Sequence, residues 1–255
     1  DSFYTVTIYG ERDRIEELKA GIDALKTITG VEKVLLAIPG EMMQGYGHLG
    51  VEVRKVDTVY PAAFPQKIMQ NVIGRTWPAG QSAQDLGLCF ITAEAVASLG
   101  TAFTESRYPV RKLLTVVDKA LNQTLVSAVI GTPIGQILDS LGIRLNEKDR
   151  IIIGGPMTGS AVYSTDYPVS PDMDAIMVQD RNDIAEISDY PCINCGECVR
   201  ICPVRIPVNM LVRFLEAGQY EAGADQYDLY SCIGCGLCSF VCVSKIPIFQ
   251  FIRLA

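Results

Sequence analysis

The segments CINCGECVRICPVRIP (192–207) and CIGCGLCSFVCVSKIP (232–247) decide the fold of the last quarter of this chain. They lie forty residues apart and share the frame CIxCGxCxxxCxxxIP, in which the cysteine spacing is C-x₂-C-x₂-C-x₃-C. Eight of the nine cysteines of the chain fall within the two segments. An internal duplication is the simplest explanation of such a repeat.

This spacing is typical of cysteines that bind a [4Fe–4S] cluster, because one cube needs four thiolates that converge on its corners. Gly196 and Gly236 follow the second cysteine of each segment, where the absence of a side chain lets the backbone pass close to a cube. We expect the first three cysteines on a tight loop and the fourth at the start of a helix. Backbone N–H groups of the loop are expected to point at the cluster sulfurs.

In proteins with two such clusters, the fourth cysteine of each segment binds the other cluster. The predicted ligands are Cys192, Cys195, Cys198 and Cys242 for cluster 1, and Cys232, Cys235, Cys238 and Cys202 for cluster 2. Pro203 follows the fourth cysteine of the first segment, and Val243 stands at the corresponding place in the second. Since proline is not a ligand, this departure does not affect cluster assembly. A helix over 207–218 is predicted to pack over the clusters through Met210, Leu211, Phe214 and Leu215.

Zinc and disulfides are the two alternative uses of these cysteines. Zinc sites usually pair two CxxC units across a longer gap, whereas each segment here places four cysteines within eleven residues. Disulfides require an oxidising compartment, and the sequence carries no signal for one. The two adjacent copies of the spacing therefore favour iron–sulfur clusters and an electron-transfer role.

The first part of the chain alternates predicted strands and helices. The expected strands are FYTVTIY (3–9), VEKVLLAI (31–38), VEVRKV (51–56) and LGLCFIT (86–92), with helices expected over 11–28, 66–73 and 93–103. Gly30 is expected to end the first helix. This alternation is typical of an α/β domain with a mostly parallel, Rossmann-like sheet, which we place at residues 1–108.

The pattern changes from residue 109. Two paired strands, VRKLLTVV (110–117) and QTLVSAVI (123–130), precede a short helix over 133–142 and a return strand at 149–155. This order favours a small β-grasp (SLBB-like) module at residues 109–180. A helical ferredoxin-type domain with the two clusters is expected at residues 181–255.

Composition and charge exclude several function classes. The chain has 255 residues, of which 49% are hydrophobic and 20% charged, and its net charge of −7 disfavours binding to nucleic acid. No run reaches the roughly 18 apolar residues of a membrane span. The amino terminus lacks the features of a secretion signal, so a cytoplasmic location is expected.

Three further features carry weaker signals. GYGHLG (45–50) matches the dinucleotide pattern G-x-G-x-x-G but leads into a predicted strand, so we interpret it as a surface loop, with His48 solvated. Cys89 is expected to be a small buried core residue rather than a ninth ligand. GGPMTG (154–159) is expected to form a tight turn that requires positive φ.

The order of an α/β segment, a β-grasp module ending in GGPMTG and then two cysteine segments resembles RnfC, the C subunit of Rnf-type ferredoxin:NAD⁺ oxidoreductases. The resemblance implies FMN, an NADH site and two [4Fe–4S] clusters, with electron exchange between NADH and ferredoxin coupled to ion transport in a translocase complex of an anaerobic bacterium. It also implies other redox subunits, including membrane subunits, and ferredoxin or flavoprotein partners, which hold the chain at the cytoplasmic side of the membrane. The candidate cofactor residues are Gly154, Gly155, Gly159 and Lys67.

The chain departs from the RnfC pattern in two places. The glycine-rich flavin loop of the family lies upstream of the first residue, and YPAAFPQK (60–67) replaces a YPQGGEKQ-like stretch. A fragment, a processed piece and a divergent paralogue all fit these departures. We therefore expect FMN and NAD(H) only of a full-length form, with the present chain acting as a relay that neither holds FMN tightly nor oxidises NADH. The alternative functions are a subunit of another soluble redox complex, such as a cobalamin-reductase-like protein or an NADH-feeding module, and a docking scaffold that passes no electrons.

Overall fold

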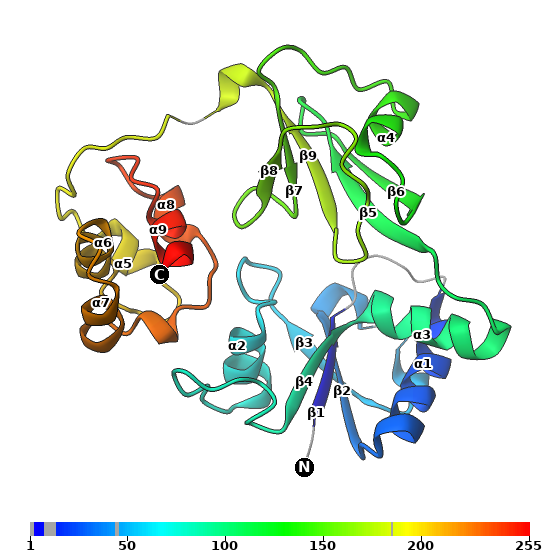
Figure 1. Cartoon of the computed structure of the whole chain (residues 1–255). Helices are drawn as coiled ribbons and strands as arrows, with labels where there is room; N and C mark the ends of the chain where they lie inside the picture. Colours follow the sequence, from blue (N-terminus) through cyan, green and yellow to red (C-terminus); the bar gives the residue numbers. More distant parts are fainter. Residues whose placement is uncertain (1–2, 8–13, 44–45, 185) are drawn as a thin grey trace. The chain divides into compact units, whose positions relative to one another are not determined.

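The computed structural model of the chain describes residues 3–7, 14–43, 46–184 and 186–255. The chain divides into two compact units, Asp1–Pro109 and Val110–Ala255 (Figure 1). Each unit contains one sheet with its own hydrophobic core. The architecture is therefore mixed α/β, followed by a helical, cysteine-rich end.

All neighbouring strands in the sheet of the first unit are parallel. The strands are β1 (Phe3–Thr7), β2 (Lys33–Pro39), β3 (Glu52–Val56) and β4 (Leu88–Thr92), in the order β3-β2-β1-β4. The parallel sheet expected from the alternation of strands and helices is thus confirmed. The expected strand at residues 51–56 lies at an edge of this sheet.

Helices cover both faces of this sheet, because successive side chains of a strand point to opposite faces. On one face, Val34, Leu36 and Ile38 of β2 share a buried cluster with helices α1 (Ile15–Thr29) and α3 (Ala93–Glu105). On the other face, Leu35 and Ala37 contact α2 (Pro65–Ile68), which continues as a π-helical turn at Met69–Ile73.

The helices α1 and α3 approach each other closely at two glycines. A Cβ atom on Gly21 would lie 1.9 Å from the backbone oxygen of Val96, and one on Gly100 would lie 1.9 Å from the oxygen of Glu17. Gly30 then ends α1 in the left-handed conformation, with φ of 68°, as the sequence predicts.

The second unit contains a mixed sheet of the order β6-β5-β9-β7-β8. Its elements are β5 (Arg111–Val117), β6 (Gln123–Val129), α4 (Ile134–Ser140), β7 (Arg150–Ile153), β8 (Ser160–Val162) and β9 (Ala175–Gln179). The antiparallel pair β5–β6, the short helix and the return strand are confirmed. The sequence prediction missed β8 and β9, although β9 is the central strand and buries Ile176 and Val178 against α4.

Short helices form the cysteine-rich end of the second unit (Figure 1). They are α5 (Glu197–Ile201), α6 (Val208–Glu216), α7 (Tyr220–Gln226), α8 (Leu237–Phe240) and α9 (Ile248–Leu254), with a 3₁₀ turn at Leu229–Ser231.

The helix between the cysteine segments, α6, buries Val208, Leu211, Val212 and Leu215. The predicted face was therefore half wrong, because Met210 and Phe214 are only half-buried. The buried set follows the i, i+3, i+4, i+7 spacing of an amphipathic helix, which β-branched valines satisfy as well as larger residues do. Among the described residues, no helix is long and apolar enough to cross a membrane.

Candidate metal centre

The two cysteine segments adopt the same backbone conformation. In each segment a glycine with positive φ (78° for Gly196, 74° for Gly236) immediately precedes a short helix, α5 or α8. The third cysteine lies inside that helix, and the fourth, Cys202 or Cys242, lies at or just beyond its end. The expectation that the fourth cysteine begins a helix is therefore wrong, because the left-handed glycine ends the loop earlier and lets the helix begin before the third cysteine.

Other residues with left-handed φ also repeat at a distance of forty residues. Asn194 and Gly234 have φ of 59° and 68°, and Arg205 and Lys245 have φ of 58° and 56°. A non-glycine residue rarely adopts this conformation unless its surroundings require it. The duplication visible in the sequence is thus a duplication of backbone structure as well.

Two apolar cavities gather the eight cysteines into two groups of four. One cavity is lined by Cys202, Cys232, Cys235 and Cys238. The other is lined by Cys192, Cys195, Cys198 and Cys242. Each group takes its fourth cysteine from the other segment, which is the grouping that crossed ligation requires.

The arrangement of these cysteines can be compared with the needs of a single metal ion. A tetrahedral zinc site with Zn–S bonds of about 2.3 Å places its sulfur atoms about 3.8 Å apart. Within the described ranges, no group of three or more Cys, His, Asp or Glu side chains is arranged to hold one metal ion. A cube of four irons and four sulfides is wider than one ion and holds its thiolates further apart than a zinc ion does.

Burial favours the protonated form of one thiol in each group, Cys198 and Cys238. It raises the pKa of Cys198 to about 11 and that of Cys238 to about 12, and neighbouring cysteine thiolates add to both increases. The thiolate form that binds iron is therefore costly without the metal. Cluster binding must supply this free energy, which couples the cofactor to the folding of the region.

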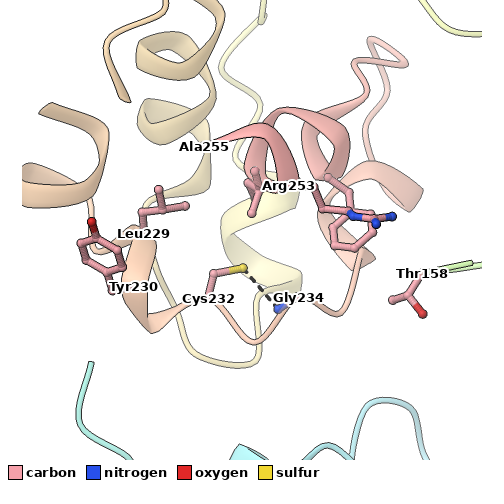
Figure 2. A pocket seen from close by; sticks show the side chains of 9 residues that line it. Thr158, Leu229, Tyr230, Cys232, Gly234, Arg253 and Ala255 are labelled. Atoms are coloured by element: carbon pink, nitrogen blue, oxygen red, sulfur yellow. Dashed lines mark hydrogen bonds between the residues drawn. The ribbon is translucent and has the colours of Figure 1, made fainter. Parts of the chain in front are cut away.

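Backbone N–H groups point at sulfur atoms of the second segment. The N–H of Gly234 donates a hydrogen bond to Sγ of Cys232, with a nitrogen–sulfur distance of 3.4 Å (Figure 2). Burial raises the pKa of Cys235, and the N–H of Leu237 opposes this increase. Hydrogen bonds to sulfur stabilise negative charge on a cluster and thereby tune its reduction potential.

Two arginines that the sequence prediction missed support the first segment. Arg200 donates from Nη2 to the backbone oxygen of Cys195 over 3.2 Å, and Arg213 donates from Nη2 to the oxygen of Cys192 over 3.5 Å. Arg200 also forms an ion pair with Glu197. The i, i+3 spacing of Glu197 and Arg200 was the available signal for this pair.

The candidate flavin residues lie in both units. In the first unit, Nζ of Lys67 donates to Oε1 of Gln70 over 2.7 Å. In the second unit, Gly154 and Gly155 have φ of 89° and 106°, which confirms the tight turn. The N–H of Gly154 donates to the oxygen of Ala175, and the N–H of Gly159 to that of Gly155, each over 2.9 Å. The N–H of Gly154 therefore pairs with strand β9, and the N–H of Gly159 closes the turn.

Two other expectations concern the first unit. In GYGHLG, Gly45 and the side chain of His48 lie outside the described residues, and the segment leads into β3 as predicted. The interpretation as a surface loop is wrong for Tyr46 and Leu49, which are 1% and 4% exposed and belong to the core of the first unit. Cys89 is half-buried, not fully buried, because β4 is an edge strand of the sheet. Burial raises the pKa of its thiol.

Comparison with known proteins gives matches to an iron–sulfur domain family and to the C subunits of oxidoreductase complexes. Residues 191–247 match the model of the 4Fe–4S dicluster domain. The chain is 29% identical over 219 residues to the C subunit of the ion-translocating oxidoreductase complex of Pseudomonas aeruginosa, a match that covers 82% of this chain and 28% of that protein.

Two further relatives have related names. The C subunit of the ion-translocating oxidoreductase complex of Rhodobacter capsulatus is 29% identical over 223 residues, covering 84% of this chain and 43% of the relative. The C subunit of the proton-translocating ferredoxin:NAD(+) oxidoreductase complex of Clostridium ljungdahlii is 26% identical over 222 residues, covering 84% of this chain and 49% of the relative. The chain thus spans less than half the length of these relatives.

The matched dicluster domain contains all eight cysteines of the two groups. These matches confirm the resemblance drawn from the cysteine segments and GGPMTG: over about four fifths of its length, the chain is similar to RnfC, the C subunit of ion-translocating oxidoreductase complexes.

Proposed function

We propose that this chain is an electron-transfer subunit of an Rnf-like NADH:ferredoxin oxidoreductase complex. Its two [4Fe–4S] clusters would relay electrons between a flavin and NADH site and partner subunits. The observation that carries this proposal is the gathering of eight cysteines into two crossed groups of four, each around an apolar cavity. The similarity to the C subunits of ion-translocating oxidoreductase complexes supports the choice of complex.

The two groups of cysteines are close enough to influence each other. Burial is the main cause of the raised pKa of Cys238, and the charge of Cys198 in the other group contributes to it. Each bound cluster would supply one-electron redox chemistry. The chain itself provides the thiolate ligands, the apolar lining that excludes water and the backbone N–H groups that stabilise negative charge on sulfur.

The proposed domains are residues 1–108 as a Rossmann-like α/β domain, 109–180 as a β-grasp (SLBB-like) module and 181–255 as the ferredoxin-type domain. The parallel order of the first sheet and the hairpin, helix and return strand of the second support this division. We further propose that the chain works at the cytoplasmic side of a membrane, attached through partner subunits. FMN and NAD(H) are proposed for the full-length form only.

Iron counting and electron paramagnetic resonance of the anaerobically purified chain test the central proposal. We expect about eight irons per chain and, after reduction with dithionite, the broadened spectrum of two interacting spins. Stoichiometric zinc without visible absorption would contradict the proposal. Titration of the same sample with FMN and then NADH tests the relay assignment. Tight FMN binding with bleaching of the clusters by NADH would mean that this chain oxidises NADH by itself and is not only a relay.

A further inference from the structure

The two cysteine loops differ in exposure although their backbones are the same. In the first segment Cys195 is exposed and the neighbouring Ile193 is 66% exposed. Their counterparts in the second segment, Cys235 and Ile233, are 8% and 7% exposed. The covering of the second loop therefore comes from another part of the fold, not from the loop itself.

One segment that packs on this loop is GGPMTG, residues 154–159, which follows β7 in the same unit, while Phe249 and Ile252 of α9 line the same cavity as Cys235 and Ile233. A Cβ atom on Gly236 would lie 2.4 Å from the backbone oxygen of Met157, too close for any side chain. A Cβ atom on Gly196, which has nearly the same φ, would meet nothing nearer than Nη1 of Arg200 at 3.5 Å. A distant segment of the chain thus crowds the glycine of the second loop, whereas no distant segment crowds the glycine of the first loop.

The same segment shares a cavity with a ligand of the second cluster. Thr158 lines a cavity of about 430 Å³ together with Cys232 and Gly234 (Figure 2). The segment is held in a tight fold of its own, since a Cβ atom on Gly159 would lie 2.3 Å from the backbone oxygen of Gly155. It can therefore act as a fixed cover and not as a loose loop.

We propose that residues 154–159 cap cluster 2, the cluster of Cys202, Cys232, Cys235 and Cys238, so that cluster 1 is the cluster that exchanges electrons with partners in solution. This inference rests on the proposed function, because it requires that both clusters are bound. A cluster with four thiolates becomes more negative when it accepts an electron, and burial disfavours that charge. Cluster 2 therefore has the lower reduction potential, while the exposed loop at Cys195 gives cluster 1 the faster exchange with solution.

The variants Gly236→Ala and Gly196→Ala form a matched pair that tests the cap. Each adds one methyl group at a left-handed φ, so the backbone strain is the same, but only Gly236→Ala displaces Met157. In the wild-type protein we expect iron release to a strong chelator in two phases, with cluster 2 as the slow phase. Gly236→Ala should accelerate the slow phase of iron release several-fold and raise the reduction potential of cluster 2. Gly196→Ala should leave the slow phase and the potential of cluster 2 at their wild-type values.

Amide hydrogen exchange gives a readout that does not depend on the clusters. The protection of the amides in residues 154–159 should fall in Gly236→Ala and stay at the wild-type level in Gly196→Ala. Gly159→Ala is the second variant, because it disturbs the cap without altering either cysteine segment. It should also accelerate iron release from cluster 2, and it takes the place of Gly236→Ala in the test if that variant does not assemble its clusters.

The outcomes separate the two proposals. Two clusters that release iron at equal rates in the wild-type protein would overturn the cap but leave the electron-transfer proposal in place. Equal acceleration by Gly236→Ala and Gly196→Ala would also overturn the cap, because only backbone strain would then matter. Absence of iron from the wild-type protein would refute the electron-transfer proposal itself.

Discussion

The first cysteine segment is stabilised by side chains, whereas the second is stabilised by packing. In the first, Nδ2 of Asn209 donates to Oδ1 of Asn194 over 2.7 Å, and Arg200 donates to the backbone oxygen of Cys195. The second has Gly234 and Phe240 at the positions of Asn194 and Arg200. Its loop is instead buried beneath neighbouring backbone.

Exposure accounts for only part of this difference. An exposed loop can satisfy its backbone carbonyl groups with charged side chains at little cost, because water solvates the remaining charge. Phe240, at the position of Arg200, is itself 73% exposed, so the second segment lacks an arginine there for a reason other than burial, and its loop packs closely against the backbone of Met157. One cysteine frame can thus be held in place by two different sets of interactions.

The largest effect is expected from removing two cysteines at once, either from the same cluster or from different clusters. If ligation is crossed, the double variant Cys202→Ala/Cys232→Ala disrupts one cluster and keeps about four irons, whereas Cys202→Ala/Cys192→Ala disrupts both and keeps almost none. Iron counting and the reduced electron paramagnetic resonance spectrum measure this. The reverse result would mean that each segment binds its own cluster, and Cys89→Ala is the control that should retain eight irons.

A smaller effect is expected from the helices that follow the two segments. Leu211 of α6 is fully buried, while Leu254 of α9 is 75% exposed. Leu211→Ala should destabilise the ferredoxin-type region by about 2–5 kcal/mol, because it removes buried methyl groups and leaves a cavity. Leu254→Ala, which deletes the same atoms, should change the free energy of unfolding by less than about 0.5 kcal/mol.

Urea unfolding under anaerobic conditions, followed by the visible absorbance of the clusters, compares these two variants. Equal shifts of the two midpoints would show that α6 does not carry the core of the region. The comparison of the segments would then extend only to their loops, not to the helices that follow them.

The smallest effect is expected at Arg200. Arg200→Gln removes a positive charge beside Cys195 and should lower the reduction potential of cluster 1. The decrease should be less than about 59 mV, which corresponds to a tenfold change in the equilibrium constant of a one-electron reduction. The potential of cluster 2 should not move. Arg205→Gln, at an exposed arginine of the same segment, is the control, and potentiometric titration is the measurement.

The same ion pair predicts a dependence on pH. Hydrogen bonding from Arg200, with its positive charge, lowers the pKa of Glu197 below its usual range. A lowered carboxylate pKa stabilises the folded state above the pKa of the unfolded state, and this contribution is lost as the pH falls through the folded pKa. The difference in the free energy of unfolding between the wild-type protein and Arg200→Gln should therefore become smaller as the pH falls through the pKa of Glu197.

The amino-acid sequence by itself determined the features that depend on local spacing. The eight cysteines, the repeat of forty residues, the alternation of strands and helices in the first unit and the turn at Gly154 and Gly155 all follow from motifs or periodicity within a short stretch of chain. Such features are set by the stereochemistry of neighbouring residues, so one sequence is enough to predict them.

Only the tertiary structure decided which residues are covered and by what. The central position of β9, the half-burial of Cys89 at an edge strand and the contact of Met157 with Gly236 depend on segments far apart in the sequence. Gly196 and Gly236 occupy identical places in two copies of one motif and have nearly the same φ. They differ because long-range packing buries one copy and leaves the other exposed, and burial is a property of the whole fold.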